Sequence, residues 1–142
     1  MTWEGLFFPK ISYFYTIQPT LMLQTLVHYF LHFIFIGAIA YWYDKKNWKR
    51  NWLILLGTMA VDIDHLIANP IFAENRCSIG FHLLHSEYVI PLYFLGAIFL
   101  KNYTLRLVAI GLAFHMVTDT IDCFWMYSKC SCEFFEVFQG LR

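Results

Sequence analysis

The chain has 142 residues, of which 59% are hydrophobic and 14% charged, and its mean hydropathy is +0.52. Soluble domains carry about 25% charged residues, so this composition excludes an ordinary water-soluble domain and indicates a protein with lipid as its solvent. The formal net charge is zero, which gives no indication of a nucleic-acid partner. The expected fold class is an all-α integral membrane protein, a bundle of about four transmembrane helices.

Residues 1–20 precede the first long apolar run and are rich in aromatic side chains. Glu4 and the lack of a basic start argue against a cleavable signal peptide. We expect this segment to lie at the membrane surface as an aromatic interfacial segment, and a short re-entrant helix is the alternative.

Four apolar segments follow in chain order. A helix needs about 20 apolar residues to cross about 30 Å of hydrocarbon. The expected helices cover residues 21–43, 52–68, 82–100 and 105–125, and they form a transmembrane domain over 21–126. Residues 127–142 are expected to form an extramembrane tail.

Basic residues concentrate on one predicted face of the bundle. With four spans, the loops 44–51 and 101–104 lie on the same face. Together with Arg106 they contain six of the ten basic residues: Lys45, Lys46, Lys49, Arg50, Lys101 and Arg106. The positive-inside rule makes this face cytoplasmic, so both termini are expected on the outer side.

Histidines and aspartates gather at one predicted depth. Counting about 1.5 Å per residue from the basic face puts six of them about 14–22 Å away. These six are His28, His32, Asp62, His85, His115 and Asp119. An isolated charge at a helix centre costs at least about 2.5–3.5 kcal/mol, so these side chains are expected to face one another.

The spacing within each helix supports one shared site, because residues three or four apart lie on the same helix face. Such sets are His28 with His32, His82 with His85, and His115 with Asp119 and Asp122. Asp62, Asp64 and His65 form a compact cluster where the second helix ends. No lysine or arginine falls in this layer, so a bound cation is expected to supply the missing positive charge.

Mixed imidazole and carboxylate donors predict a divalent transition metal, with zinc as the first choice and manganese or iron as alternatives. The donors outnumber the ligands of one ion. Either two ions share bridging aspartates, or one ion is held by histidines that carboxylates orient. The predicted ligands are His28, Asp62, Asp64, His65, His82, His85, His115 and Asp119. For His32 and His82, a simple hydrogen bond to a neighbouring helix is an equally good interpretation.

Three short elements between about residues 25 and 122 resemble a known family. They are Val61-Asp62-Ile63-Asp64-His65, His85-Ser86 and His115-Met116-Val117-Thr118-Asp119. They are similar to the Pro-Asp-Ile-Asp-His, His-Arg-x-x-Thr-His-Ser and His-x-x-x-Asp elements of the LexA-regulated, membrane-bound metal-dependent hydrolases of bacterial inner membranes. His28 matches an early histidine of that family.

The chain departs from this family at two points. Val61 replaces the proline, and Gly80 stands at the spacing of the first histidine in the middle element, for which His82 is the candidate substitute. The whole chain looks still closer to a small, uncharacterised bacterial membrane family with a Cys-Ser-Ile-Gly-Phe-His segment.

The resemblance implies a metal-dependent hydrolase of the bacterial inner membrane, and the predicted topology puts its site on the outer side. A metal with an open position lowers the pKa of bound water to about 7, which is the chemistry a hydrolase needs. The expected substrate is an ester or phosphoester, with a membrane lipid or lipid-like molecule as the partner. Asp64, Glu87 and Ser86 are the candidate catalytic residues, although Glu87 also fits a solvated helix start.

Two other function classes use the same residues. One is a metal or proton transporter, against which the apolar cytoplasmic halves of the helices argue. The other is a structural metal-binding membrane protein without catalysis. Homo-oligomerisation stays open, because nothing in the sequence argues for or against it.

All four cysteines fall on the predicted outer side, where an oxidising compartment permits disulfides. Cys77 is expected to pair with Cys123 or with the Cys130-Ser131-Cys132 element. Four unpaired thiols are the alternative.

Overall fold

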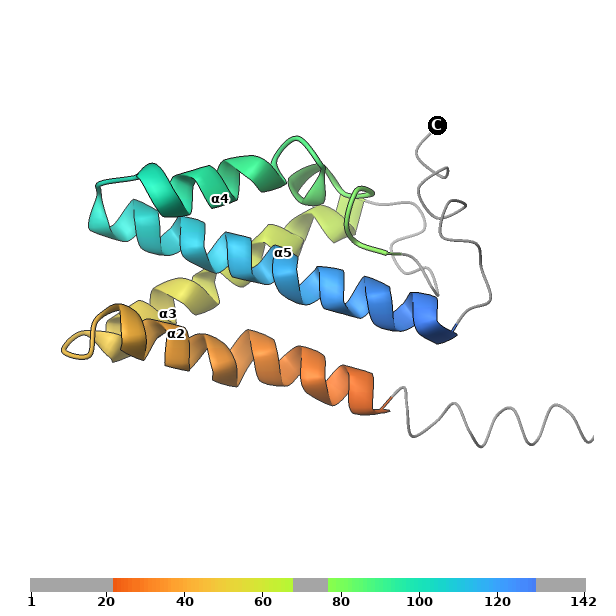
Figure 1. The fold of residues 1–142 in the computed structure, drawn as a ribbon, viewed down its shortest axis with the longest axis horizontal. Helices are drawn as coiled ribbons and strands as arrows, with labels where there is room; N and C mark the ends of the chain where they lie inside the picture. The colour runs from red at the N-terminus through yellow and green to blue at the C-terminus, as the bar shows by residue number, and fades with distance from the viewer. Residues whose placement is uncertain (1–21, 68–76, 130–142) are drawn as a thin grey trace, which may run out of the picture.

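The computed structural model describes residues 22–67 and 77–129, and within these ranges the chain is entirely helices and turns, without a strand (Figure 1). The predicted all-α fold is confirmed for this part of the chain. The aromatic segment 1–20, most of the connection after residue 67, and residues 130–142 of the tail lie outside the described residues.

The first helix is continuous from Met22 to Tyr43, close to its predicted bounds. It contains the π-helical stretch η2 (Phe30–Phe35), which leads into α2 (Ile36–Tyr43). Such π-helical turns are rare and concentrate at functional sites. The one buried residue of η2 is His32.

The second helix changes its winding halfway along. It begins as α3 (Trp48–Gly57), earlier than predicted, and continues as the 3₁₀ helix η3 (Thr58–Ile67). A 3₁₀ run of ten residues is unusual. Because it has three residues per turn, side chains two positions apart differ in direction by about 120°. Asp62 and Asp64 therefore face different neighbours.

The predicted helix at 82–100 is wrong in its first half. Only α4 (Ile90–Phe99) is α-helical, and the preceding segment forms turns and the short 3₁₀ helix η4 (Leu83–His85). Gly80 has a φ of 81°, a conformation that favours glycine, and its N–H donates to the carbonyl of His85 at 2.8 Å. Tertiary contacts thus hold residues 82–89 in turns and the short η4 despite their apolar helical pattern.

The long helix α5 (Tyr103–Lys129) forms the axis of the bundle and runs past its predicted end at 125 (Figure 1). α4 lies antiparallel along its first half. The hydroxyl of Tyr43 donates to the carbonyl of Tyr103 at 3.2 Å, and the hydroxyl of Tyr103 donates to Asp44 at 3.1 Å. The two connecting loops therefore meet at one end of the bundle, as predicted.

Two of the described helices are long and apolar enough to cross a membrane. They are Met22–Tyr43, with a mean hydropathy of 1.6, and Tyr103–Ser128, with 1.5. The ten-residue α4 is shorter.

The core between α2, α3 and α5 is built from Ile36, Ala40, Leu55 and Leu107. Above it, α5 approaches the α3–η3 junction most closely at Gly111. A Cβ atom at Gly111 would lie 2.8 Å from the Thr58 side chain and 2.9 Å from Leu55 Cδ2. The approach of these helices therefore requires glycine at this position.

We expect Gly111→Ala to destabilise the bundle by about 1–3 kcal/mol, because the added methyl overpacks the contact. The matched control is Gly57→Ala, whose Cβ meets no atom within 4 Å and whose helix propensity improves. Thermal unfolding in detergent should show a lower midpoint for Gly111→Ala alone. Equal midpoints for both variants would contradict the close approach.

Candidate metal centre

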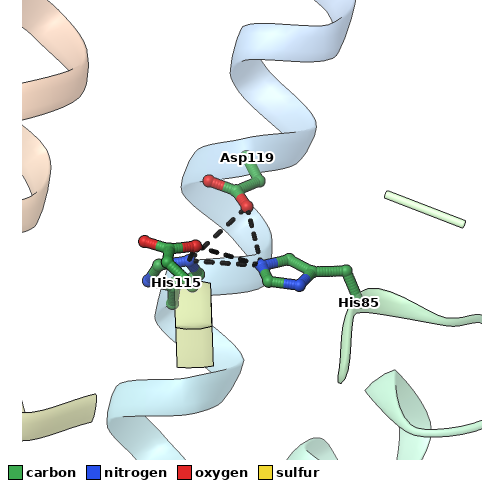
Figure 2. Close-up of side chains that lie close together, drawn as sticks. His85, His115 and Asp119 are labelled. Atoms are coloured by element: carbon green, nitrogen blue, oxygen red, sulfur yellow. Dashed lines mark hydrogen bonds and ion pairs between the residues drawn. The ribbon is translucent and has the colours of Figure 1, made fainter. Parts of the chain in front are cut away.

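Four side chains from η3, η4 and α5 converge in the bundle, and we call them the central group: Asp62, His85, His115 and Asp119. Figure 2 shows His85 reaching across to His115 and Asp119, which lie one turn apart on α5. The side chains of His85, His115 and Asp119 are buried, whereas that of Asp62 is 41% exposed. The central group is therefore enclosed except at Asp62.

The donor atoms of the central group lie close to one another. His85 Nε2 is 3.2 Å from Asp119 Oδ2 and 3.4 Å from Asp62 Oδ1. His115 Nε2 is 3.1 Å from Asp62 Oδ1 and 3.5 Å from Asp119 Oδ2. The two Nε2 atoms are 3.4 Å apart.

These separations fit a tetrahedral metal. With metal–ligand bonds of about 2.0–2.1 Å, the ligand atoms of a tetrahedral zinc site lie about 3.3 Å from one another. Hydrogen bonds satisfy the contacts less well, because each Nε2 carries at most one proton and an ionised carboxylate only accepts. A cation at the centre would contact all four donor atoms at once, so the residues present fit a metal ion.

Asp64 holds His85 from the opposite side of its ring. Its Oδ2 lies 3.2 Å from His85 Nδ1 and accepts the backbone N–H of Leu84 at 2.8 Å. Its Oδ1 lies 3.1 Å from Nδ1 of His65, whose Nε2 is 3.2 Å from Ser78 Oγ. Metal-bound histidines usually give their second ring N–H to such a carboxylate. Asp64 therefore lies outside the central group and orients His85, which belongs to it.

Two further groups of donors adjoin the central group. One combines Asp64, His65 and His85. The other, which we call the lateral group, combines His28, His32 and Asp119. His32 Nε2 lies 3.6 Å from Asp119 Oδ1, and His28 Nδ1 pairs with the Asp122 carboxylate. The predicted convergence of the four apolar segments on one site thus matches the geometry.

His32 is the donor that the predicted ligand set omitted. Its side chain is fully buried, and neither ring nitrogen has a hydrogen-bond partner. The i, i+4 spacing to His28 was the signal in the sequence, but that spacing alone also fits a simple interhelical hydrogen bond. Asp122, which shares a predicted helix face with His115 and Asp119, pairs with His28.

Three predicted residues lie outside all of these groups. The buried ring of His82 stacks on that of His65, with 3.8 Å between centroids. The carbonyl of Ser86 accepts the N–H groups of Val89 and Ile90, each at 3.0 Å, where α4 begins. Glu87 is exposed. The catalytic roles of Ser86 and Glu87 therefore stay predictions from sequence.

The site carboxylates have histidines as their charged partners. Within residues 22–67 and 77–129, every ion pair made by Asp62, Asp64, Asp119 or Asp122 is to a histidine. The described lysines and arginines form no ion pair with them.

A disulfide fixes the loop that carries His85. Cys77, just before this loop, is bonded to Cys123 on α5, and their Cα atoms are 5.2 Å apart. Cys123 lies one turn beyond Asp119. Of the predicted pairings, the structure contains this one, and Cys130 and Cys132 lie outside the described residues.

A comparison with protein families finds a match for most of the chain. A protein-family profile described as "Family of unknown function (DUF6122)" matches residues 22–126. The matched range includes all three donor groups, from His28 to Asp119. No curated protein and no solved structure matches the chain.

We expect the Cys77 and Cys123 thiols to resist alkylation in the unreduced protein. In a background with Cys130 and Cys132 replaced by serine, no thiol should react before reduction, and two should react after it. Cys77→Ala should release one reactive thiol and lower stability by about 2–4 kcal/mol, because the disulfide closes a long loop. Two reactive thiols in unreduced, unfolded protein would contradict the assignment.

Proposed function

We propose that this chain, which belongs to the family of unknown function DUF6122, is a membrane-embedded metal-dependent hydrolase. The observation that carries the proposal is the central group, in which two imidazoles and two carboxylates approach one another at the spacing of a tetrahedral metal site. Zinc is the metal that this donor set and geometry favour, with manganese or iron next.

Membrane insertion is supported by length and by exposed apolar side chains. α3 and η3 together extend about 35 Å, at about 1.5 and 2.0 Å per residue, so they too have the length to span hydrocarbon. Large side chains such as Leu26, Trp42 and Phe99 are each more than 60% exposed. Lipid would cover a surface of this kind, which soluble monomers rarely present.

The orientation of the site follows from two independent arguments. The basic loops at 44–51 and 101–104 lie at one end of the bundle, which the positive-inside rule makes cytoplasmic. The Cys77–Cys123 disulfide lies beyond the donor groups on α5, towards the other end, and disulfides persist in oxidising compartments. We therefore assign the site to the outer side, in a bacterial inner membrane as the resemblance to membrane-bound metal-dependent hydrolases implies.

The central group has a side where water could enter. A divalent metal bound by these four residues would supply a Lewis acid that lowers the pKa of a water molecule at an additional position. Asp62 is the exposed member, and its contacts to both histidines are made through Oδ1. We therefore assign its other oxygen, Oδ2, as the acceptor of a proton from the entering water, while Asp64 keeps His85 in position.

An apolar cavity that is wide open to the outside, next to η3 and η4, favours a lipid-like substrate. It has a volume of about 350 Å³, within the range of ligand pockets. Its lining is Ile54, Gly57, Thr58, Ala60, Val61, Leu84, Tyr93, Val108 and Leu112. Val61 and Leu84 directly adjoin Asp62 and His85 in the chain. We propose that an acyl chain binds in this cavity, which would leave the attached ester or phosphoester near Asp62 and His85.

We expect the purified protein to contain bound transition metal and to hydrolyse a lipid ester or phosphoester. His115→Ala should lose both metal and activity, because it removes a central donor. Asp64→Asn should weaken metal affinity about 10–100-fold, because it removes the carboxylate that orients His85. Elemental analysis and titration against a competing chelator measure these effects.

The control is Asp44→Asn, an aspartate at the opposite end of the bundle, which should keep full metal content. Turnover that survives complete removal of metal would refute the hydrolase mechanism. Zinc uptake by proteoliposomes, without hydrolysis of any membrane ester, would favour the transporter instead.

We further expect Gly57→Leu to shorten the acyl chain that the enzyme accepts. A side chain at this position meets open space, so it should fill the cavity without disturbing the packing. The KM for long-chain lipid substrates should rise about tenfold or more, as expected for losing a few buried methylenes, while short-chain substrates and metal content stay unchanged. An equal effect on short and long chains would contradict the cavity's role.

A further inference from the structure

We infer that the lateral group, His28, His32 and Asp119, holds a second divalent metal ion, and that Asp119 bridges it to the ion of the central group. This inference rests on the proposed function, because it takes the central group to bind metal. It makes the centre dinuclear and names phosphoesters as the substrate class.

The two oxygens of Asp119 face different groups. Oδ2 lies 3.2 Å from His85 Nε2 and 3.5 Å from His115 Nε2, in the central group. Oδ1 lies 3.6 Å from His32 Nε2, in the lateral group. A carboxylate that presents one oxygen to each of two donor groups is arranged as a bridge between two ions, which lie about 3.5–4 Å apart in two-metal sites.

The environment of His32 independently indicates a bound cation. It is fully buried beside the rings of His28 and His115, with centroid distances of 4.3 and 4.5 Å. Both of its ring nitrogens lack a hydrogen-bond partner. A buried polar group left unsatisfied costs about 1–3 kcal/mol. A cation held by Nε2 would remove that cost for one nitrogen and explain why an imidazole lies here.

The lateral group repeats the arrangement around His85. Asp122 pairs with Nδ1 of His28, as Asp64 pairs with Nδ1 of His85. In both cases a carboxylate fixes the orientation of the imidazole and leaves Nε2 for a metal. Each of the two groups thus has a histidine with its own orienting aspartate, and Asp119 belongs to both.

The donor counts assign different roles to the two positions. The central group has four protein donors, whereas the lateral group has three and is partly exposed, with the His28 side chain at 29%. The lateral ion would therefore keep more open positions for substrate oxygens. Two ions a few ångströms apart stabilise both the attacking and the leaving oxygen of a phosphoester, so we assign the substrate to this class.

The test is metal stoichiometry in the full chain, purified in detergent and dialysed against zinc. We expect two ions per chain in the wild type and one in His32→Ala, because that variant removes a donor of the lateral group alone. Asp122→Asn leaves all direct donors in place, and it should weaken the binding of one of the two ions. Asp44→Asn alters an aspartate at the opposite end of the bundle and should retain both ions.

A second readout is the electron paramagnetic resonance spectrum of protein loaded with Mn²⁺. A bridged pair should give an exchange-coupled spectrum, which His32→Ala should convert to that of an isolated ion. One ion per chain, lost in His115→Ala and kept in His32→Ala, would overturn the second site and leave the proposed function intact. A wild type without metal would overturn both. Two uncoupled ions would overturn the Asp119 bridge.

Discussion

The structure depends on compensating the charge of carboxylates enclosed in an apolar bundle. Asp119 needs this compensation most, because its side chain is only 7% exposed. Its partners are the imidazoles of His32, His85 and His115. A buried charge is costly unless it is paired and hydrogen-bonded. Imidazoles supply full compensation only when they are protonated, whereas a metal ion supplies it with the imidazoles neutral. The same donor arrangement therefore balances charge and prepares a Lewis acid.

The irregular backbone of the protein gathers around these carboxylates. The π-helical η2 carries His32, the 3₁₀ helix η3 carries Asp62 and Asp64, and the short 3₁₀ helix η4 carries His85. The regular α-helical donors are His28, just before η2, and His115 and Asp119 on α5. Departures from ideal geometry concentrate where function constrains the chain. These irregular segments cluster around the donor groups, whereas the end of the bundle with the basic loops is regular. This clustering is itself a reason to treat the donor groups as the functional site.

The sequence was sufficient to predict the features that follow from periodicity. The apolar runs indicated helices, and the His115 and Asp119 spacing indicated one shared face, because an α-helix fixes the relation between i and i+4. The meeting of the two basic loops followed from alternating spans and is confirmed by the bond from Tyr103 to Asp44. Cys77 with Cys123 was one of the predicted disulfide pairings.

The remaining features depend on contacts that periodicity does not contain. Residues 82–89 have a helical apolar pattern, but a loop forms because Asp64 accepts the N–H of Leu84 and the disulfide anchors the preceding residue 77. The different roles of Asp62 and Asp64 follow from 3₁₀ winding, which an Asp-x-Asp-His element does not reveal. For His32, only the fold shows that its ring meets Asp119 rather than a backbone carbonyl.

The packing on the side of the basic loops bears on the choice between hydrolase and transporter. A relay needs polar groups that continue from the site towards both faces of the membrane. In the described residues, the rings of Phe35 and Phe114 stack just below His115, and Ile36, Ala40, Leu55 and Leu107 fill the core beyond them. Beyond this core, at the end with the basic loops, the side-chain amide of Asn51 donates to the hydroxyl of Tyr103. At the site itself, by contrast, the Asp62 side chain is 41% exposed. A site closed on one side and open on the other suits a reaction with a substrate that enters and leaves by the same route.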